Sequence, residues 1–236
     1  MLTRRSLLLT GGALVLAAIS GTMLARRVDH DAATAALWSQ RDPTTFDGLV
    51  HYATLAANSH NAQGWRFRQT AAGVAILPDM ARALPVADAD HHHLYASLDC
   101  AAENLMLAAG ATGRSAAIDF VASGEGQVEV ALGQDGSRDP LFDAILSRQC
   151  TRSDYDGRAV PLADLAALEA AARVPGAEVM LITDPARMAQ VLDLILAANT
   201  AQVSDPAFAA ELKSWMRFNA RSAAETGDGL YAVATG

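Results

Sequence analysis

A long stripe of apolar residues places the strongest constraint on what this chain can fold into. The stripe recurs at helical spacing and consists of Leu94, Leu98, Ala101, Leu105 and Ala108. Because Gly110 follows directly, the pattern predicts a helix from about His93 to Ala109 with one buried face and a glycine at its C-terminal end. The other elements must cover the buried face of this helix.

Short strand-like runs lie on both sides of this helix. The runs alternate or cluster apolar residues, and a further helix precedes them, with Leu49 and Tyr52 at helical spacing. Helices interleaved with isolated strands predict an α+β sandwich. The expected elements are a helix at 47–57, strands at 65–68 and 74–77 closed by Pro78, and a hairpin of strands 118–121 and 128–132.

The second half of the chain repeats the order helix, loop and strand. Its expected elements are helices at 140–149 and 162–172, a strand at 178–182, and helices at 186–201 and 206–219. Residues 226–236 then form a glycine-bearing loop that no later strand closes. We therefore expect the chain to be a fragment with an incomplete second half, uncovered apolar faces and low stability.

The first 27 residues have the layout of a twin-arginine export signal. Arg4 and Arg5 stand directly before an uncharged run from Ser6 to Ala25, and Gly11 and Gly12 lower its hydrophobicity. A plain membrane anchor is the alternative, because the run could just cross a hydrocarbon layer, and both hold if the signal is not cleaved. The twin-arginine machinery carries folded proteins, which suits a chain that acquires a cofactor in the cytoplasm. The expected location is the periplasm or the outer face of the inner or plasma membrane.

Charge excludes one class of partner. The 236 residues carry a formal net charge of −8, with 51% hydrophobic residues and a sequence pI near 5.1. Nucleic-acid and anionic-membrane surfaces need clustered Lys and Arg, so neither is expected, and any phosphate must be met locally. The hydrophobic content is sufficient for a packed core.

The cysteines and a histidine run offer little chemistry. Cys100 and Cys150 stand far apart and outside any metal or redox spacing, so we expect both to be unpaired, with Cys100 packing on its helix. A disulfide between them stays open as an alternative. The run His91 to His93 cannot direct three adjacent side chains at one ion from a helix, so a solvated helix start is expected rather than a metal site.

The loop from Asn58 to Gly64, called here the amide loop, is the most informative stretch. Ser59, Asn61 and Gln63 place hydroxyl and amide groups at alternate positions, which provides both donors and acceptors. Such groups suit a planar heterocycle with carbonyl and ring-nitrogen edges. A capping and turn loop is the plainer interpretation of the same residues.

A second polar stretch could hold a phosphate. Arg148 and Arg152, with Ser153 beside them, follow the helix expected at 140–149, and a guanidinium binds phosphate oxygens through two parallel hydrogen bonds. Surface ion pairing with Asp154 and Asp156 is the alternative. We call residues 148–153 the arginine motif.

Both stretches resemble signatures of one family. Ser59, Asn61, Gln63, Trp65 and Phe67 match the SxNxQPWxF signature of the nitroreductases, with Gly64 in place of the usual proline. The resemblance implies that the amide loop lies against a flavin ring and that the Trp anchors the following strand. The glycine implies a more flexible loop.

The arginine motif is similar to the RxSxRxY/F motif of the same family, whose arginines hold the phosphate of FMN. It follows the amide loop here, whereas it precedes that loop in an ordinary nitroreductase. With the twin-arginine start, this order resembles the Acg-type FMN-binding proteins, which are fused pseudo-dimers of the nitroreductase fold. The resemblance covers nearly everything after residue 45 and implies a first half at 45–138, a partial second half at 139–236, and a monomer with one composite FMN site.

The expected function is that of an FMN-dependent oxidoreductase acting between a small-molecule electron donor and acceptor. The flavin performs electron transfer, so no catalytic side chain is required, and the expected cofactor-binding residues are Ser59, Asn61, Gln63, Arg148, Arg152 and Ser153. A protein that binds or stores flavin without turnover, and a remnant without cofactor, are the alternatives. The chain contains no GxGxxG, Walker A, HExxH or GxSxG sequence, so other nucleotide-binding and hydrolytic classes lack support.

Overall fold

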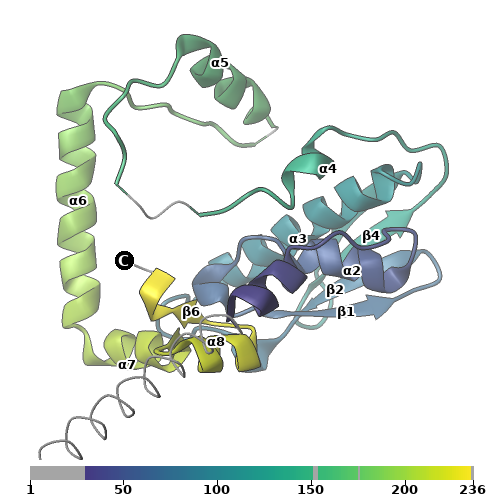
Figure 1. The fold of residues 1–236 in the computed structure, drawn as a ribbon, viewed down its shortest axis with the longest axis horizontal. Helices are drawn as coiled ribbons and strands as arrows, with labels where there is room; N and C mark the ends of the chain where they lie inside the picture. The colour runs from purple at the N-terminus through teal and green to yellow at the C-terminus, as the bar shows by residue number, and fades with distance from the viewer. Residues whose placement is uncertain (1–29, 151–153, 175, 235–236) are drawn as a thin grey trace, which may run out of the picture. The chain divides into compact units, whose positions relative to one another are not determined.

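The computed structural model describes residues 30–150, 154–174 and 176–234 (Figure 1). Residues 30–37 are helical. The strands are β1 (Trp65–Gln69), β2 (Gly73–Pro78), β3 (Ala116–Val121), β4 (Gln127–Leu132), β5 (Met216–Arg217) and β6 (Leu230–Tyr231). The α-helices are α2 (Phe46–Thr54), α3 (His92–Gly110), α4 (Leu141–Ala144), α5 (Leu162–Ala171), α6 (Pro185–Ser204), α7 (Pro206–Trp215) and α8 (Ala220–Thr226), and three short 3₁₀ turns are η1 (Ser59–Asn61), η2 (Met80–Arg82) and η3 (Ala232–Ala234).

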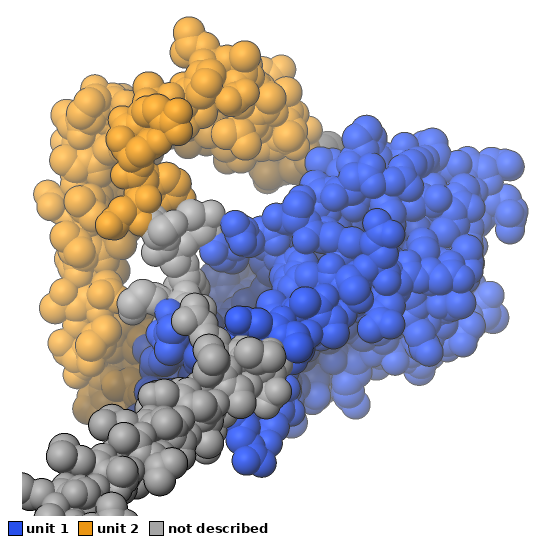
Figure 2. All heavy atoms as spheres, in the orientation of Figure 1, with its two compact units in different colours: residues 1–150, 211–236 blue, residues 151–210 orange. Residues whose placement is uncertain are grey.

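The chain divides into two compact units (Figure 2). The first unit contains residues 1–150 and 211–236, and the second contains residues 151–210. The contacts of the amide loop and of the residues around it lie within the first unit. The division into halves at 45–138 and 139–236 stays a prediction.

An antiparallel sheet with the strand order β1-β2-β4-β3 forms the centre of the first unit. Trp65 pairs with Pro78, Ile76 pairs with Val128, and Ile118 pairs with Val130. Both expected strand pairs are therefore confirmed, and so is the mixed α+β class. The nitroreductase-like fold and the pseudo-dimer stay predictions.

Helix α3 packs on the sheet, and α2 packs on α3. The expected apolar stripe is the buried face of α3, with Leu98 and Leu105 both 0% exposed. Gly48 of α2 lies against the chain before it, where an added Cβ would be 1.7 Å from the carbonyl oxygen of Asp42. Only glycine fits at that position, so α2 is held tightly against residues 42–45.

A buried carboxylate begins α3. The Oδ1 atom of Asp88 accepts from the backbone N–H of His93 at 2.9 Å, and Oδ2 accepts from that of Leu94 at 2.8 Å. These amides belong to the first turn of the helix and have no partner inside it, so Asp88 satisfies them from outside. Asp88 thus holds the backbone of His93 in the first turn of the helix, while the side chains of His92 and His93 are exposed.

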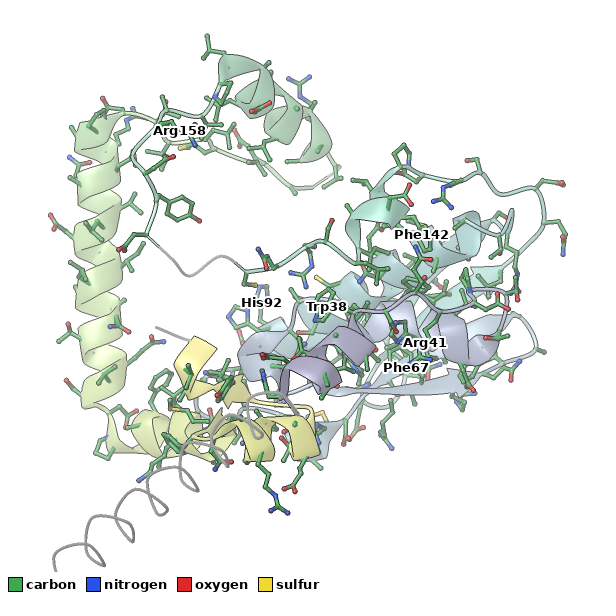
Figure 3. All side chains as sticks on the ribbon, viewed as in Figure 1. Trp38, Arg41, Phe67, His92, Phe142 and Arg158 are labelled. Carbon is green, nitrogen blue, oxygen red and sulfur yellow. The ribbon has the colours of Figure 1, made fainter. Side chains whose placement is uncertain are left out.

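Two of the elements expected in the second half differ from the prediction. The helix expected at 140–149 ends at Ala144, because Ile145 and Ser147 donate to carbonyls three residues back and tighten the chain into turns. Residues 178–182 form no strand, since this segment has no partner strand among the described residues. The single turn of α4 carries Phe142, which is labelled in Figure 3. Its ring packs against that of Tyr52, with ring centroids 4.9 Å apart.

The last expected helix is also shorter than predicted. Helix α7 ends at Trp215, because Met216 and Arg217 leave it to pair in parallel with Leu230 and Tyr231. Asn219 caps α8 by accepting from the N–H of Ser222. The segment expected to be an open loop, at 226–236, begins at the last residue of α8 and contains β6 and η3. It belongs to the first unit, which resumes at residue 211.

The second unit contains α5, α6 and the beginning of α7. Its longest helix, α6, starts at Pro185 with Asp184 as the cap, as the sequence predicts. Apolar side chains on α6 are exposed, including Met188, Leu194 and Ile195. Among the described residues of the whole chain, no helix combines the length and apolar composition that crossing a membrane requires.

Candidate functional site

The amide loop is held in an unusual backbone conformation. His60, Asn61 and Gln63 all have positive φ angles, of 51°, 50° and 52°. Residues other than glycine cost about 1–3 kcal/mol each in such regions, and they cluster where a binding site fixes them. The Oδ1 atom of Asn58 supports the loop by accepting from the N–H of Gln63 at 2.8 Å.

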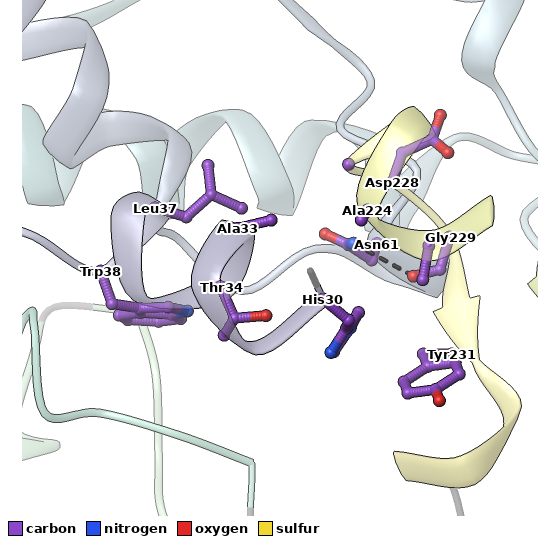
Figure 4. Close-up of a pocket in the computed structure, with 12 residues that line it drawn as sticks. His30, Ala33, Thr34, Leu37, Trp38, Asn61, Ala224, Asp228, Gly229 and Tyr231 are labelled. Atoms are coloured by element: carbon purple, nitrogen blue, oxygen red, sulfur yellow. Dashed lines mark hydrogen bonds between the residues drawn. The ribbon is translucent and has the colours of Figure 1, made fainter. Parts of the chain in front are cut away.

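The amide side chains of the loop contact a turn far away in the sequence. The Nδ2 atom of Asn61 donates to the carbonyl of Gly229 at 3.1 Å, and the N–H of Gly229 donates back to the carbonyl of Asn61 at 3.0 Å (Figure 4). The Nε2 atom of Gln63 donates to the carbonyl of Gly227 at 2.7 Å. The loop therefore binds the turn at residues 227–229 with three hydrogen bonds, two to carbonyl oxygens and one from an N–H.

Asp228 lies between the two contacted residues and is bound by two arginines. Arg82 donates to its Oδ2, and Nη2 of Arg217 donates to its Oδ1 at 2.6 Å. Burial acts to raise the pKa of Asp228, but the hydrogen bonds from Arg217 and Arg82 outweigh it, so the pKa lies below its ordinary value. Both guanidinium groups also flank the ring of Trp215, with Cζ atoms 5.4 and 5.9 Å from its centroid.

A small cavity opens beside Asn61. Its volume is about 190 Å³, and its lining includes Trp38, Asn61, Asp228 and Tyr231 (Figure 4). His30 forms another wall and stacks on Tyr231, with ring centroids 4.5 Å apart. The cavity thus joins an amide of the loop to three aromatic side chains.

Only part of the arginine motif lies among the described residues. Arg148 donates from Nη2 to the carbonyl of Leu55 at 3.0 Å, and its Cζ atom lies 5.9 Å from the ring centroid of Trp38. Because Trp38 also lines the cavity beside Asn61, the structure brings Arg148 to the neighbourhood of the amide loop. Arg152 and Ser153 lie outside the described residues.

The residues after the amide loop anchor it to the sheet. Trp65 is buried at the start of β1, and its ring centroid lies 6.3 Å from that of Phe67. An added Cβ on Gly64 would lie 2.6 Å from Cδ1 of Leu94, so the glycine allows the loop to approach α3 closely. Ser59 begins η1, which the sequence did not predict as a separate turn.

His60 is the other titratable group of the loop. Burial lowers its pKa, and the nearby charge of Glu211 partly offsets this by raising it. Its Nδ1 atom is buried and has no hydrogen-bond partner among the described residues. Neutral imidazole is the favoured form, which leaves a polar atom that a ligand could satisfy.

Both cysteines are free, as expected, but Cys100 is exposed on α3 rather than packed. Cys100 lies outside the apolar stripe of the helix, so it is not covered by the core. Within the described residues, no group of three or more His, Cys, Asp or Glu side chains could hold a metal ion.

The site contains residues that the sequence did not suggest. Trp38 precedes the region of family resemblance, and Arg82 and Asp228 are separated by 146 residues. No local pattern marks such a pair, although the Gly-Asp-Gly sequence at 227–229 indicates a tight turn. No family model matches the chain, and no curated protein matches it.

Proposed function

We propose that this chain is an FMN-dependent oxidoreductase of the nitroreductase type. In this proposal the amide loop binds the edge of the flavin ring through Ser59, Asn61 and Gln63, and the arginine motif binds the phosphate through Arg148, Arg152 and Ser153. The proposed arrangement is one composite site in a fused pseudo-dimer, as in the Acg-type proteins that the sequence resembles.

The hydrogen-bond pattern of the amide loop carries the proposal. The loop offers a donor from Gln63, an acceptor from the backbone of Asn61 and a donor from the side chain of Asn61. The pyrimidine edge of a flavin presents the complementary order, with one N–H between two carbonyls. A loop that already binds two carbonyl acceptors and one N–H donor of a turn has the groups needed to bind two carbonyls and one N–H of a flavin.

The surroundings of Arg148 support the phosphate assignment. Its guanidinium faces Trp38, an aromatic wall of the cavity that Asn61 also lines. In a chain of net charge −8, a phosphate needs such a local cationic partner. Of the two carboxylates named as alternative partners of the arginine motif, Asp156 pairs with Arg158.

FMN would supply the electron transfer, and the chain would bind and orient it. The strained amide loop would hold the ring edge, and the aromatic side chains of Trp38 and Tyr231 would exclude water from one side of it. Electron transfer by the flavin would require no acid or base from the protein.

A titration with FMN and a matched pair of ring analogues tests the proposal. We expect the purified protein to quench flavin fluorescence at one equivalent and to bind lumiflavin about tenfold more tightly than N3-methyl-lumiflavin, since the methyl group removes one hydrogen-bond donor, worth about 1.4 kcal/mol. Equal affinity for both analogues would contradict the edge assignment, and absence of flavin binding would contradict the function. Reduction of the bound flavin by NAD(P)H distinguishes an oxidoreductase from a protein that only stores flavin.

We further propose that the twin-arginine machinery exports the chain in its folded form. Replacing both Arg4 and Arg5 with lysine keeps the charge and is expected to retain the protein in the cytoplasm, because the arginine pair is the specific element of the signal. Cell fractionation with immunoblotting measures the result. The matched control replaces Arg26 and Arg27 with lysine, and export that survives the first change would contradict the assignment.

A further inference from the structure

The edge of the amide loop that is proposed to bind flavin is filled by the protein itself. Gly227 and Gly229 supply the two carbonyls and the N–H that satisfy Asn61 and Gln63. We call residues 227–229 the Gly227–Gly229 turn. It presents the same acceptor, donor and acceptor groups that the flavin edge presents, so the turn and the flavin cannot occupy the loop together.

The turn has a shape that only glycine provides at both ends. Gly227 and Gly229 have φ angles of 64° and 75°. An added Cβ on Gly229 would lie 2.3 Å from the carbonyl oxygen of Trp215. Each amide of the loop therefore meets bare backbone, with no side chain from the turn in the way.

Asp228 holds the turn in place. Its carboxylate binds Arg82, which comes from η2 beside the loop, and Arg217, which comes from β5 of the same terminal segment. Glu211 adds a second attachment, because its carboxylate accepts from the N–H groups of Val86 and Ala87 at 3.0 and 2.8 Å. The attachment at Asp228 is local to the turn, so it can open while the attachment at Glu211 stays closed.

The cavity beside the turn is too small for the cofactor. Its volume of about 190 Å³ is below the range of roughly 300–1,000 Å³ that is typical of ligand pockets. Asp228, Gly229 and Tyr231 form one of its walls (Figure 4). Removal of the turn would both free the hydrogen-bonding edge and enlarge the cavity.

We propose that the Gly227–Gly229 turn is a displaceable gate that occupies the flavin edge until FMN replaces it, with the Asp228 ion pairs as its latch. This inference rests on the proposed FMN function. The apparent affinity for FMN is reduced by the fraction of molecules in which the gate is closed, so a weaker latch strengthens binding.

Hydrogen exchange of the unaltered protein tests the gate directly. FMN should accelerate exchange of the Gly229 amide, because its bond to the carbonyl of Asn61 is lost, while an ordinary ligand would slow exchange around its site. A Gly229 amide that stays equally protected, or becomes more protected, in the FMN complex would overturn the gate.

A variant of the latch provides the second test. Asp228→Asn keeps the size of the side chain and removes its charge, so FMN should bind about tenfold more tightly, which corresponds to about 1.4 kcal/mol of weaker closure. The control is Glu225→Gln, which removes an exposed ion pair with Arg221 on the neighbouring helix α8 and should leave the affinity unchanged.

The outcomes separate this inference from the proposed function. Equal FMN affinity in the parent and in Asp228→Asn, with Gly229 protected in both complexes, overturns the gate and leaves the FMN function standing. Failure of the parent and both variants to bind FMN overturns the proposed function, and the gate with it. Tighter binding by Asp228→Asn, with exposure of Gly229, supports both.

Discussion

Replacing Leu105 with alanine is expected to lower the free energy of unfolding of the first unit by about 2–5 kcal/mol. Leu105 is 0% exposed and lies on the face of α3 that packs on the sheet. The change removes buried methyl groups and leaves a cavity, because the neighbouring strands and α2 can relax only partly. Urea unfolding followed by circular dichroism measures the effect.

The matched control removes the same atoms from a surface position. Leu141 is 59% exposed at the start of α4, so Leu141→Ala should change stability by less than about 0.5 kcal/mol. Equal effects of the two substitutions would mean that the face of α3 is not the core of this unit. The result does not depend on FMN and therefore tests the fold alone.

Replacing Arg152 with alanine is expected to weaken FMN binding by about ten- to a hundredfold. Hydrogen bonds between charged groups contribute roughly 1.5–3 kcal/mol each, and each 1.4 kcal/mol is a factor of ten in the dissociation constant. The expectation follows from the resemblance of the arginine motif to the phosphate-binding motif of nitroreductases. Fluorescence titration with FMN gives the measurement.

Two comparisons make the Arg152 result specific. Lumiflavin has no phosphate, so its affinity should not change in Arg152→Ala. Arg158 is exposed and paired with Asp156, and Arg158→Ala should bind FMN like the parent (Figure 3). If Arg152→Ala also binds FMN like the parent, the phosphate assignment is wrong and the composite site loses its main support.

Local patterns predicted the first part of the fold well. The stripe from Leu94 to Ala108 and the strand runs at 65–68 and 128–132 carry their own periodicity, so helix α3 and the hairpins follow from neighbouring residues alone. The run at 178–182 has the composition of a strand, but a strand also needs a partner, and composition does not reveal whether one exists. The opposite error occurred at Met216 and Arg217, which were expected in a helix but form a strand, because they pair with residues 230–231.

The candidate site divides in the same way. Asn61 and Gln63 lie in one short signature, so the sequence alone indicates both as candidate binding residues. Arg82, Asp228 and Trp38 come together only through the tertiary structure, and no local spacing in the sequence links them. The positive φ angle of His60 could not be predicted from the sequence either, because histidine indicates a left-handed conformation much less strongly than glycine does.

Because Asn61 and Gly229 are far apart in the sequence, the amide loop is synthesised well before the turn that it binds. The two residues are 168 positions apart, so at about 5–20 residues per second Gly229 leaves the ribosome roughly 10–30 s after Asn61. The residues of the four-stranded sheet, α3 and the amide loop are all synthesised before those of the Gly227–Gly229 turn. A newly made chain therefore passes through an interval in which the amide loop has no turn to bind, and the loop can bind the turn only after residue 229 has been translated.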